Sequence, residues 1–390
     1  MSFCILIFMN SAEFGCHTLY LFISISIYSI RFLSLNTLPQ IEILKGVSLK
    51  PYNTFQLDAS AAFWVEIHQP DDMLKLLDTP VFHRETRYVL GGGSNVLFAQ
   101  DYSGLIIKNS IPGIEVLSED DRHVVLRAGA GVVWDDLVKY TVDRGWGGLE
   151  NLSMIPGQTG AAPIQNIGAY GVELMSTFVS LDAINLESGI PESFDREMCR
   201  FGYRDSIFKT THKGTYLITH VTLNLTKSPE LNLDYGNIRE VLASEGVTKP
   251  GIRDVSMAVR KIRASKLPDP AVTGNAGSFF KNPVISAEQF DSLHSIHSDI
   301  PSYPSGSRIK IPAAWLIDQC GFRGKRVGDS GVHERHALIL VNHGEATGLE
   351  VIGLAANIQQ EVSERFGVTL EPEVNIVGDN PLADGAGSGN

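Results

Sequence analysis

The spacing of hydrophobic residues predicts short strands and few long helices over the first 230 residues. Short apolar runs predict a helix over 71–78 and strands over 87–90, 104–108 and 123–128. A further helix is indicated by apolar positions at helical spacing, namely Trp134, Leu137, Val138 and Thr141. Gly145 is placed to end that helix. Because glycines separate the strands and few long helices alternate with them, an α+β fold is favoured over a doubly wound sheet.

The last third of the chain reads as a separate unit. Residues 255–266 predict a helix with a basic face, and Pro268 and Pro270 force an extended segment after it, so a domain boundary is expected over 266–275. A helix should begin at the capping pattern of Ser286 and Gln289, and another should cover 313–320. The remaining elements suggest an α/β unit: strands over 337–341 and 368–370, and between them a long helix capped by Thr347 and Glu350 and stopped by Gly367.

Residues 1–47 differ from the rest of the chain. Residues 18–30 form an uncharged apolar run, but the first ten residues lack the positive charge of a signal peptide. The run is also shorter than the roughly 20 apolar residues that a spanning helix needs. We therefore expect a poorly structured or spurious leader, with the globular protein beginning near residues 46–51. The Gly-rich, polar tail over 379–390 is expected to be disordered.

The bulk composition narrows the function classes. A chain of 390 residues with 43% hydrophobic and 19% charged residues has room for two or three packed units. The formal net charge is -12 and no basic block occurs, which argues against nucleic acid or an anionic membrane as the main partner. The four cysteines, Cys4, Cys16, Cys199 and Cys320, contain no Cys-x-x-Cys pair and favour a reducing compartment.

Residues 88–98 place three glycines, Gly91 to Gly93, directly after a short apolar strand. Glycines let successive backbone N–H groups converge on an anion, so the loop is a candidate phosphate cradle. A dinucleotide fingerprint would need glycine at Val96, and no Gly-Lys-Ser/Thr follows for a P-loop. A Gly-rich turn between strands remains an alternative of equal weight.

A second glycine-rich passage covers residues 147–171. Long ordered loops inside domains are usually binding elements, so this passage is favoured as a shell around a large ligand. A surface connection is the alternative, which the apolar residues 154–156 and the amides of Gln165 and Asn166 make less favourable.

Three further sites invite chemical interpretation. Arg204 can present a planar fork of donors to a carboxylate or an enolate, although an ion pair with Asp205 or another acid on a surface turn is the more common reason for such an arginine. Ser278 lies between small residues and two phenylalanines, either as a poised hydroxyl or as an ordinary turn serine. The stretch from His333 to His336 lacks the spacing of a zinc helix, so no metal site is predicted.

Several motifs occur in an order that resembles one enzyme family, the UDP-N-acetylenolpyruvoylglucosamine reductases, or MurB family, of peptidoglycan synthesis. They lie at 51–55, 91–98, 148–157, 163–174, 199–209, 266–270, 274–283, 313–320 and 370–374. The turn over 234–237 resembles the loop of the type I subgroup, whose tyrosine closes over the substrate.

The resemblance implies a two-part FAD-binding domain of the vanillyl-alcohol-oxidase (PCMH) type and a C-terminal α/β substrate-binding domain. The flavin domain would cover 48–265, in subdomains over about 48–115 and 116–265, after a leader over 1–47. The substrate domain would cover 266–378, with its last strand returning toward the flavin domain.

The reaction implied is that of a UDP-N-acetylmuramate dehydrogenase. NADPH would reduce FAD, and a hydride would pass from flavin N5 to C3 of UDP-N-acetylenolpyruvoylglucosamine. The family's catalytic residues match Arg204, Ser278 and Glu373. Arg204 would stabilise the charge that develops on the enolate, Ser278 would deliver a proton to C2, and Glu373 would act as a protonated acid beside the enol.

The binding residues also follow from the resemblance. The cofactor would be held by Gly91, Gly92, Gly93, Ser94, Asn95, Pro156, Gly157, Gly160, Ile167, Gly168 and Arg263. Contacts with the substrate or NADPH would come from Tyr203, Tyr235, Lys266, Asn282 and His336. A cytoplasmic monomer without a membrane span or a nucleic-acid partner is expected.

This chain departs from the family pattern at several positions. Ala161 and Ala162 stand where relatives often carry hydroxyl residues, so some flavin hydrogen bonds must come from backbone. Asn375 stands where a basic residue is expected, and His336 where glutamine also occurs. A flavin oxidase on the same scaffold and a flavin-binding protein without catalysis remain alternatives, the first disfavoured by the intact catalytic trio.

Overall fold

The computed structural model describes residues 41–378 and residue 382, and residues 42–378 belong to one compact unit. The expectations for the apolar run 18–30, for Cys4 and Cys16, and for nearly all of the tail over 379–390 lie outside the described residues. Within the described part of the chain, no helix combines the length and apolar character needed to cross a bilayer.

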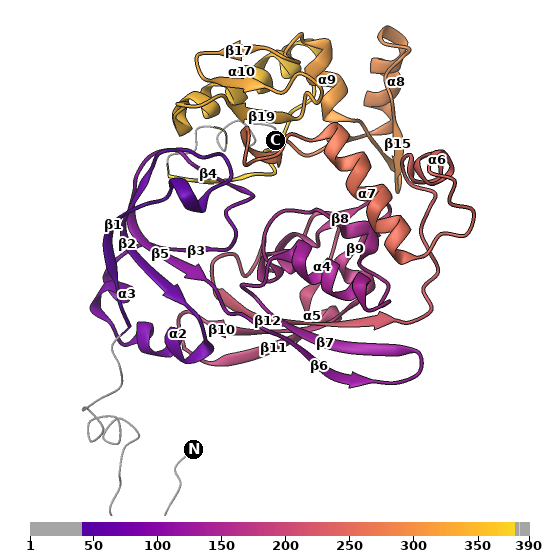
Figure 1. Ribbon diagram of the computed structural model, residues 1–390. Coiled ribbons are helices and arrows are strands. Elements are labelled where there is room, and N and C mark those ends of the chain that lie inside the picture. Colours follow the sequence, from indigo (N-terminus) through magenta and orange to yellow (C-terminus); the bar gives the residue numbers. More distant parts are fainter. Residues whose placement is uncertain (1–40, 379–381, 383–390) are drawn as a thin grey trace, which may run out of the picture. The chain divides into compact units, whose positions relative to one another are not determined.

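A four-stranded sheet carries the glycine loop (Figure 1). Its order is β1-β2-β5-β3, with β1 antiparallel to β2, and β5 parallel to both β2 and β3. Its four strands are β1 (Leu44–Ser48), β2 (Ser60–Ile67), β3 (Arg87–Leu90) and β5 (Tyr102–Asn109). The segments that connect them include η1 (Lys50–Tyr52), α2 (Pro70–Leu77) and α3 (Pro80–Arg84). The predicted helix over 71–78 and strands over 87–90 and 104–108 are therefore confirmed to within two residues.

Strand β1 begins before the point where the sequence predicts the globular fold. Leu44 pairs with Trp64 and Ser48 pairs with Ser60 of β2, and Val47 packs against the apolar cluster of this sheet. The prediction that the leader extends through residue 47 is wrong, because backbone hydrogen bonds and apolar contacts make residues 44–48 part of the sheet.

A second, antiparallel sheet has the order β11-β10-β12-β7-β6. Its strands are β6 (Ile114–Glu119), β7 (His123–Gly129), β10 (Phe178–Asn185), β11 (Pro191–Asp195) and β12 (Tyr216–Thr226). Helix α4 (Trp134–Asp143) buries its apolar face in the same core as these strands, as its spacing predicts. Gly145 follows the end of α4 in a left-handed conformation, with φ of 76°, which confirms its role as the stop.

Two more helices continue from this sheet. Helices α6 (Ile238–Ser244) and α7 (Ile252–Lys266) form a small apolar cluster together, and α7 also packs against α4. The predicted helix over 255–266 is confirmed and begins three residues earlier, because Asp254 accepts a hydrogen bond of 2.8 Å from the Gly251 N–H and caps the first turn. A short helix, α5 (Arg196–Cys199), lies between β11 and the segment that carries Arg204.

The C-terminal elements enclose a third core (Figure 1, orange to yellow). One sheet has the order β13-β19-β18-β17 and another the order β14-β16-β15. The strands are β13 (Gly274–Ser278), β14 (Val284–Ile285), β15 (Tyr303–Ser305), β16 (Arg308–Lys310), β17 (Arg326–Val327), β18 (Ser330–Val332) and β19 (Ile339–Asn342). The helices are α8 (Ala287–Ile296), α9 (Ala313–Gln319) and α10 (Gly348–Phe366).

The predicted helix caps of this part are confirmed. The Ser286 hydroxyl accepts the Gln289 N–H at 3.1 Å, and Thr347 and Glu350 form the reciprocal capping box of α10. The strand predicted over 337–341 is present as β19, displaced by one or two residues at its ends.

The strand predicted over 368–370 is wrong. Val368 and Leu370 are buried, but the backbone there is paired with no strand, and the last strand is β20 (Asn375–Val377). β20 pairs in parallel with β4 (Val96–Phe98), directly after the glycine loop. Figure 1 shows the yellow end of the chain beside indigo β4. The C-terminal elements are thereby joined to the loop through backbone hydrogen bonds.

Candidate functional site

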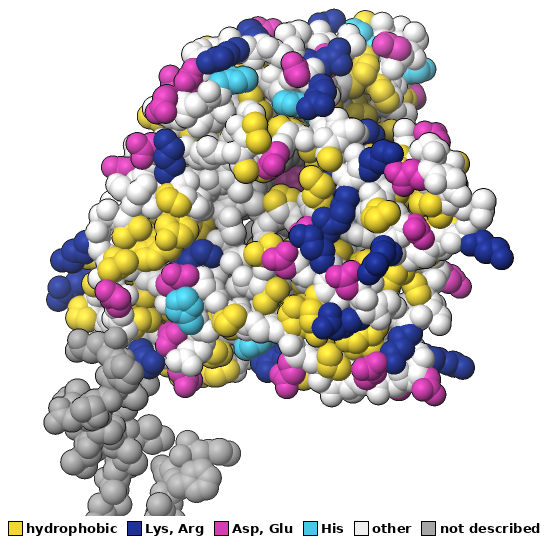
Figure 2. All heavy atoms as spheres, viewed as in Figure 1, with side chains coloured by type: hydrophobic (Ala, Val, Ile, Leu, Met, Phe, Trp, Pro, Cys, Tyr) yellow, Lys and Arg dark blue, Asp and Glu magenta, His cyan; other side chains and the backbone are white. Residues whose placement is uncertain are grey.

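A cavity of about 340 Å³ lies where the glycine loop, the 147–171 passage and the C-terminal elements meet. It is lined by all three predicted catalytic residues and by most of the predicted cofactor residues, namely Gly91, Gly92, Gly93, Ser94, Asn95, Pro156, Gly157, Ile167, Gly168 and Arg263. The face shown in Figure 2 is hollowed below the C-terminal elements, and much of the hollow is white, the colour of backbone and uncharged polar side chains.

The two glycine-rich passages face each other across this cavity. A methyl group on Gly92 would lie 3.0 Å from the Cα atom of Gly157, and one on Gly93 would lie 1.9 Å from the carbonyl oxygen of Tyr52. Gly93 also has a left-handed backbone, with φ of 64°. Glycine is therefore required here by close approach and by conformation, as the phosphate-cradle hypothesis expects.

The 147–171 passage contains little regular structure beyond short turns of 3-10 helix. The passage contains η2 (Glu150–Leu152), η3 (Thr159–Gln165) and β8 (Gly168–Ala169). The chain then continues directly into β9 (Val172–Glu173) and η4 (Leu174–Ser176). Because several of its residues line the cavity, it is a cavity wall rather than a surface connection.

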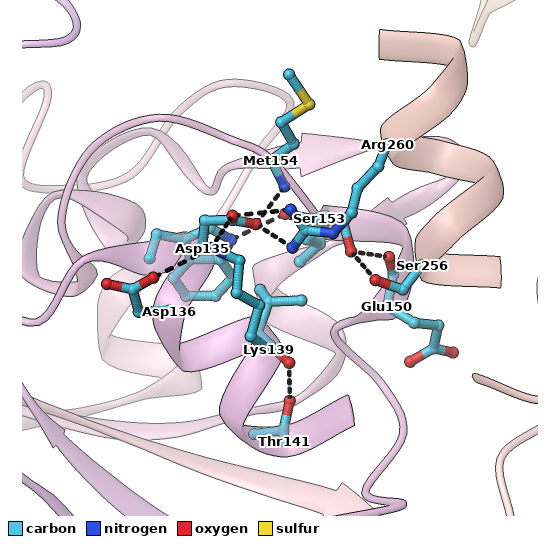
Figure 3. A network of polar contacts seen from close by, with 12 residues as sticks. Asp135, Asp136, Lys139, Thr141, Glu150, Ser153, Met154, Ser256 and Arg260 are labelled. Carbon is cyan, nitrogen blue, oxygen red and sulfur yellow. Dashed lines mark hydrogen bonds and ion pairs between the residues drawn. The ribbon is translucent and has the colours of Figure 1, made fainter. Parts of the chain in front are cut away.

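Helices α4 and α7 hold the start of this wall in place (Figure 3). Asp135 accepts the Met154 N–H at 2.6 Å, and Arg260 donates to both oxygens of Asp135 at 2.9 and 2.5 Å. Nearby, the hydroxyls of Ser153 and Ser256 lie 2.8 Å apart. Met154 has a left-handed backbone, with φ of 61°, so the Asp135 carboxylate stabilises a strained turn just before the cavity wall.

Asn95 ties the glycine loop to the opposite wall and to β20. Its amide donates to Gln165 Oε1 at 3.0 Å, and its carbonyl oxygen accepts both the backbone N–H and the side-chain amide of Asn375, at 3.1 and 3.0 Å. Asn375, where the family pattern leads one to expect a basic residue, thus holds the end of the loop.

Arg204 reaches its position through a strained turn. Its φ is 55°, its Nη2 donates to the Gly168 carbonyl at 2.7 Å, and its Nε lies 3.5 Å from Glu373 Oε1. Lys209 Nζ donates to the Arg204 carbonyl oxygen at 3.3 Å. The ion pair of the alternative is present, but its acid is Glu373 rather than Asp205, and both residues line the cavity rather than a surface turn.

Ser278 and Glu373 are brought together by backbone pairing. Ser278 is the last residue of β13, and the Glu373 N–H donates to the carbonyl oxygen of the next residue, Phe279, at 2.8 Å. Among the described residues, the Ser278 hydroxyl has no hydrogen-bond partner. It therefore does not bond to nearby backbone, as the alternative of an ordinary turn serine would require.

Two buried nitrogen atoms have no hydrogen-bond partner among the described residues, and one of them belongs to a residue of the smaller cavity. Within the described residues, Arg263 Nε and His336 Nδ1 are buried and form no hydrogen bond. Arg263 lines the cavity, and burial lowers the pKa of its guanidinium. A buried unsatisfied donor is costly, so an acceptor such as a flavin group fits there. The glycine cradle and this free donor together are consistent with a bound FAD.

A larger cavity of about 860 Å³ adjoins the first and shares the residues Tyr88, Arg204, Glu373 and Asn375 with it. Its other charged lining residues are mostly basic, namely Lys209, Lys213, Lys281 and Arg308, with acidic Asp205 and Glu371. The pKa of Lys209 is lowered, chiefly by burial, with the Glu373 carboxylate opposing this shift. The cations give this cavity the charge needed to attract an anionic substrate.

The predicted substrate residues divide into two groups. Tyr203 and Asn282 line the larger cavity, where Lys310 Nζ lies 4.4 Å from the Tyr203 ring centre. Tyr235, Lys266 and His336 line neither cavity. Tyr235 is 60% exposed and packs edge-on against Tyr170, while burial and the nearby charges of His333 and Lys266 lower the pKa of His336.

Gly160 also lines neither cavity. A methyl group on Gly160 would lie 2.5 Å from the Ala130 Cβ, so close packing explains this glycine. Sequence reasoning missed Gln158, which lines the smaller cavity, and Lys108, which donates to Gln158 Oε1 at 3.2 Å. The sequence signal that could have drawn attention to Lys108 is its position directly after the apolar run 105–107 of a predicted strand.

Comparisons with known proteins agree with the geometry. Residues 61–190 match a family described as FAD binding domain, and residues 269–377 match UDP-N-acetylenolpyruvoylglucosamine reductase, C-terminal domain. A solved structure of UDP-N-acetylenolpyruvylglucosamine reductase from Thermus caldophilus aligns over 87% of this chain and 99% of that chain, with a TM-score of 0.59 and 24% identity. That similarity supports the expected fold class.

Sequence relatives establish the family. The UDP-N-acetylenolpyruvoylglucosamine reductase of Chromobacterium violaceum is 48% identical over 333 residues, which is 85% of this chain and 98% of the relative. The protein of that name from Flavobacterium johnsoniae is 44% identical over 86% of this chain and 100% of its own. The resemblance seen in the sequence motifs is thus confirmed, and the chain belongs to the UDP-N-acetylenolpyruvoylglucosamine reductase family.

Proposed function

We propose that this chain reduces UDP-N-acetylenolpyruvoylglucosamine to UDP-N-acetylmuramate with NADPH, using a bound FAD, and that Arg204, Ser278 and Glu373 carry the chemistry. The observation that supports this most is their meeting in one cavity with the glycine loop. The three residues come from separate parts of the chain, and Arg204 Nε lies 3.5 Å from Glu373 Oε1.

When bound, FAD would supply the hydride chemistry that links oxidation of NADPH to reduction of the enolpyruvyl ether. The glycines of 91–93 and of 157 leave room for its diphosphate, and Ser94, Asn95, Pro156, Ile167, Gly168 and Arg263 are its proposed further contacts. Neutralising the diphosphate with backbone N–H groups suits the cradle, which carries no lysine or arginine of its own.

Arg204 acts on the charge that reduction places on the substrate. Addition of a hydride to C3 of the enolpyruvyl group leaves negative charge at C2, shared with the carboxylate as an enolate. A guanidinium that is already held by Gly168 and Glu373 needs little reorganisation to stabilise that charge.

Ser278 delivers the proton to C2, and its hydroxyl is free to point at the substrate. Glu373 is the proposed acid beside the enol, a role in which it must be protonated and no longer ion-paired with Arg204, and its backbone bond to Phe279 keeps it next to Ser278. A serine hydroxyl is a weak acid, so the reactivity of the enolate and these neighbours must assist the transfer.

Substrate contacts are proposed at Tyr203, Asn282, Tyr235, Lys266 and His336. The first two line the basic cavity, whose cations attract the diphosphate of the sugar nucleotide. We assign the flavin domain to residues 48–265 plus β1, and the substrate domain to 266–378. The enzyme is proposed to work as a cytoplasmic monomer.

Purified protein tests the proposal directly. The expected result is a yellow protein with a flavin spectrum that oxidises more than one NADPH per flavin only when the enolpyruvyl sugar nucleotide is present. UDP-N-acetylglucosamine, which lacks the enolpyruvyl group, serves as the matched control and should support no turnover. Oxygen consumption without the sugar nucleotide would indicate the oxidase alternative, and colour without any turnover would indicate a non-catalytic flavin protein.

A further inference from the structure

Lys108 is a buried cation in the strand that pairs with β3, the strand leading into the glycine loop. It lies in β5 and is only 8% exposed. In the parallel ladders of this sheet, Lys108 is the partner of Leu90, the residue before Gly91, and of Glu66 on the other side. Partners in parallel strands project to the same face of a sheet, so the lysine side chain belongs to the face that Leu90 occupies just before the loop.

The Lys108 ammonium has hydrogen-bond partners but no close counter-charge. Its Nζ donates to Gln158 Oε1 at 3.2 Å and to the Asn109 carbonyl at 3.3 Å. Within residues 41–378 it forms no ion pair, and Glu66 instead accepts a hydrogen bond of 2.5 Å from Ser110. Burial lowers the pKa of Lys108, and the charge of Glu66 acts in the opposite direction.

Gln158 connects this cation to the cradle. Its Oε1 would lie 3.4 Å from a methyl group on Gly91, its backbone nitrogen would lie 3.5 Å from one on Gly92, and its side chain lines the cavity. Its Nε2 donates to the Gly131 carbonyl at 2.9 Å, which fixes the orientation of the amide. The lysine is thus separated from the space in front of Gly91 by one side-chain amide.

We infer that Lys108, positioned by Gln158, is a cofactor-binding charge whose role is to offset the diphosphate of FAD at the glycine loop. The inference rests on the proposed binding of FAD. A buried lysine without a carboxylate partner destabilises the empty protein, and an anion in the adjoining cradle removes that penalty.

Reconstitution of apoprotein with flavins tests the inference without any turnover assay. Wild type and Lys108→Met are titrated with FAD and with riboflavin, which lacks phosphate, and binding is followed by flavin fluorescence. The variant should bind FAD about 10 to 100 times more weakly, as expected for loss of one unit charge several ångströms from the diphosphate, while its affinity for riboflavin changes less than threefold. The melting temperature of the apoprotein should stay equal or rise, because a buried unpaired charge has been removed.

Glu66→Gln is a second variant, for which the opposite change in FAD affinity is expected. It keeps an acceptor for Ser110 but removes the nearby negative charge, so FAD affinity should increase and riboflavin affinity should not change. Equal weakening of FAD and riboflavin binding by Lys108→Met, unchanged FAD binding, or weaker FAD binding by Glu66→Gln would each overturn the inference. A wild-type protein that binds FAD but does not turn over would refute the proposed function and leave this result intact.

Discussion

Asp135→Asn is the substitution whose cost can be worked out most directly from the contacts. The carboxylate accepts two hydrogen bonds from Arg260 and one from the Met154 N–H, and it lies 3.1 Å from Lys139 Nζ. Asparagine keeps one acceptor oxygen but places an NH2 group against a guanidinium, so one charge-assisted bond is lost and Arg260 is left partly unpaired.

The expected loss is about 2–3 kcal/mol of unfolding free energy. Hydrogen bonds to charged groups contribute about 1.5–3 kcal/mol each, and loss of a partner from a fully buried pair costs about 3–5 kcal/mol. The side chains of Asp135 and Arg260 are 18% and 26% exposed, so solvent screens part of that upper value. For a folded unit of this size, the melting temperature should fall by about 3–4 °C.

Urea denaturation of the apoprotein measures this loss, and FAD titration measures its effect on the site. Affinity should fall because Met154 immediately precedes the wall formed by Ile155, Pro156 and Gly157. Asp136→Asn is the matched control on the same helix: Asp136 is 64% exposed and pairs with Lys139, so its loss should change stability by less than about 0.5 kcal/mol. Equal effects of the two substitutions would refute the anchoring role.

The pH dependence of the same variant gives an independent check. Burial tends to raise the pKa of Asp135, but the hydrogen bonds from Arg260, the Met154 N–H and Lys139 outweigh it and lower that pKa. Because the folded-state pKa is the lower one, the stabilisation is complete at neutral pH and is lost as pH falls below about 4. The stability difference between wild type and Asp135→Asn should therefore shrink below that pH, and a constant difference would contradict the assignment.

Three further predictions concern the chemistry and the cradle. Ser278→Ala should leave reduction of the flavin by NADPH nearly unchanged in stopped-flow absorbance and slow product formation by about 10²–10⁴-fold; equal loss in both half-reactions would refute proton donation. Arg204→Lys should lower kcat for product formation by about 10²–10³-fold, because an ammonium cannot keep the bonds to Gly168 and Glu373 together, and steady-state kinetics that show only a raised KM would contradict charge stabilisation. Gly93→Ala should yield protein without flavin absorbance, since the added methyl group would lie 1.9 Å from the Tyr52 oxygen, and retention of bound FAD would show that the loop can move.

Local chemistry along the chain determined the helix ends and most strands. Helix ends are local features, because they depend on contacts between residues a few positions apart. The sequence alone therefore specifies the caps at Ser286 and Thr347 and the left-handed stops at Gly145 and Gly367. The motifs also identified the family, because side-chain type and order carry that information, and they supplied the proposal that Arg204, Ser278 and Glu373 are catalytic. The error at 368–370 has a local cause too: buried apolar residues need not pair as a strand, and here they pack into the core.

Tertiary structure alone decided which distant residues meet. The pairing of β20 with β4 brings Glu373 to the glycine loop and within 3.5 Å of Arg204, and no spacing along the chain encodes that distance. Gly160 was assigned to the cofactor by motif, yet the fold packs it against Ala130. The position of Lys108 after an apolar run was only a weak signal in the sequence, and it became informative when its burial and its contact with Gln158 were known. The sequence determines which groups are available, whereas burial and long-range backbone pairing determine which of them share one low-dielectric space and can act together.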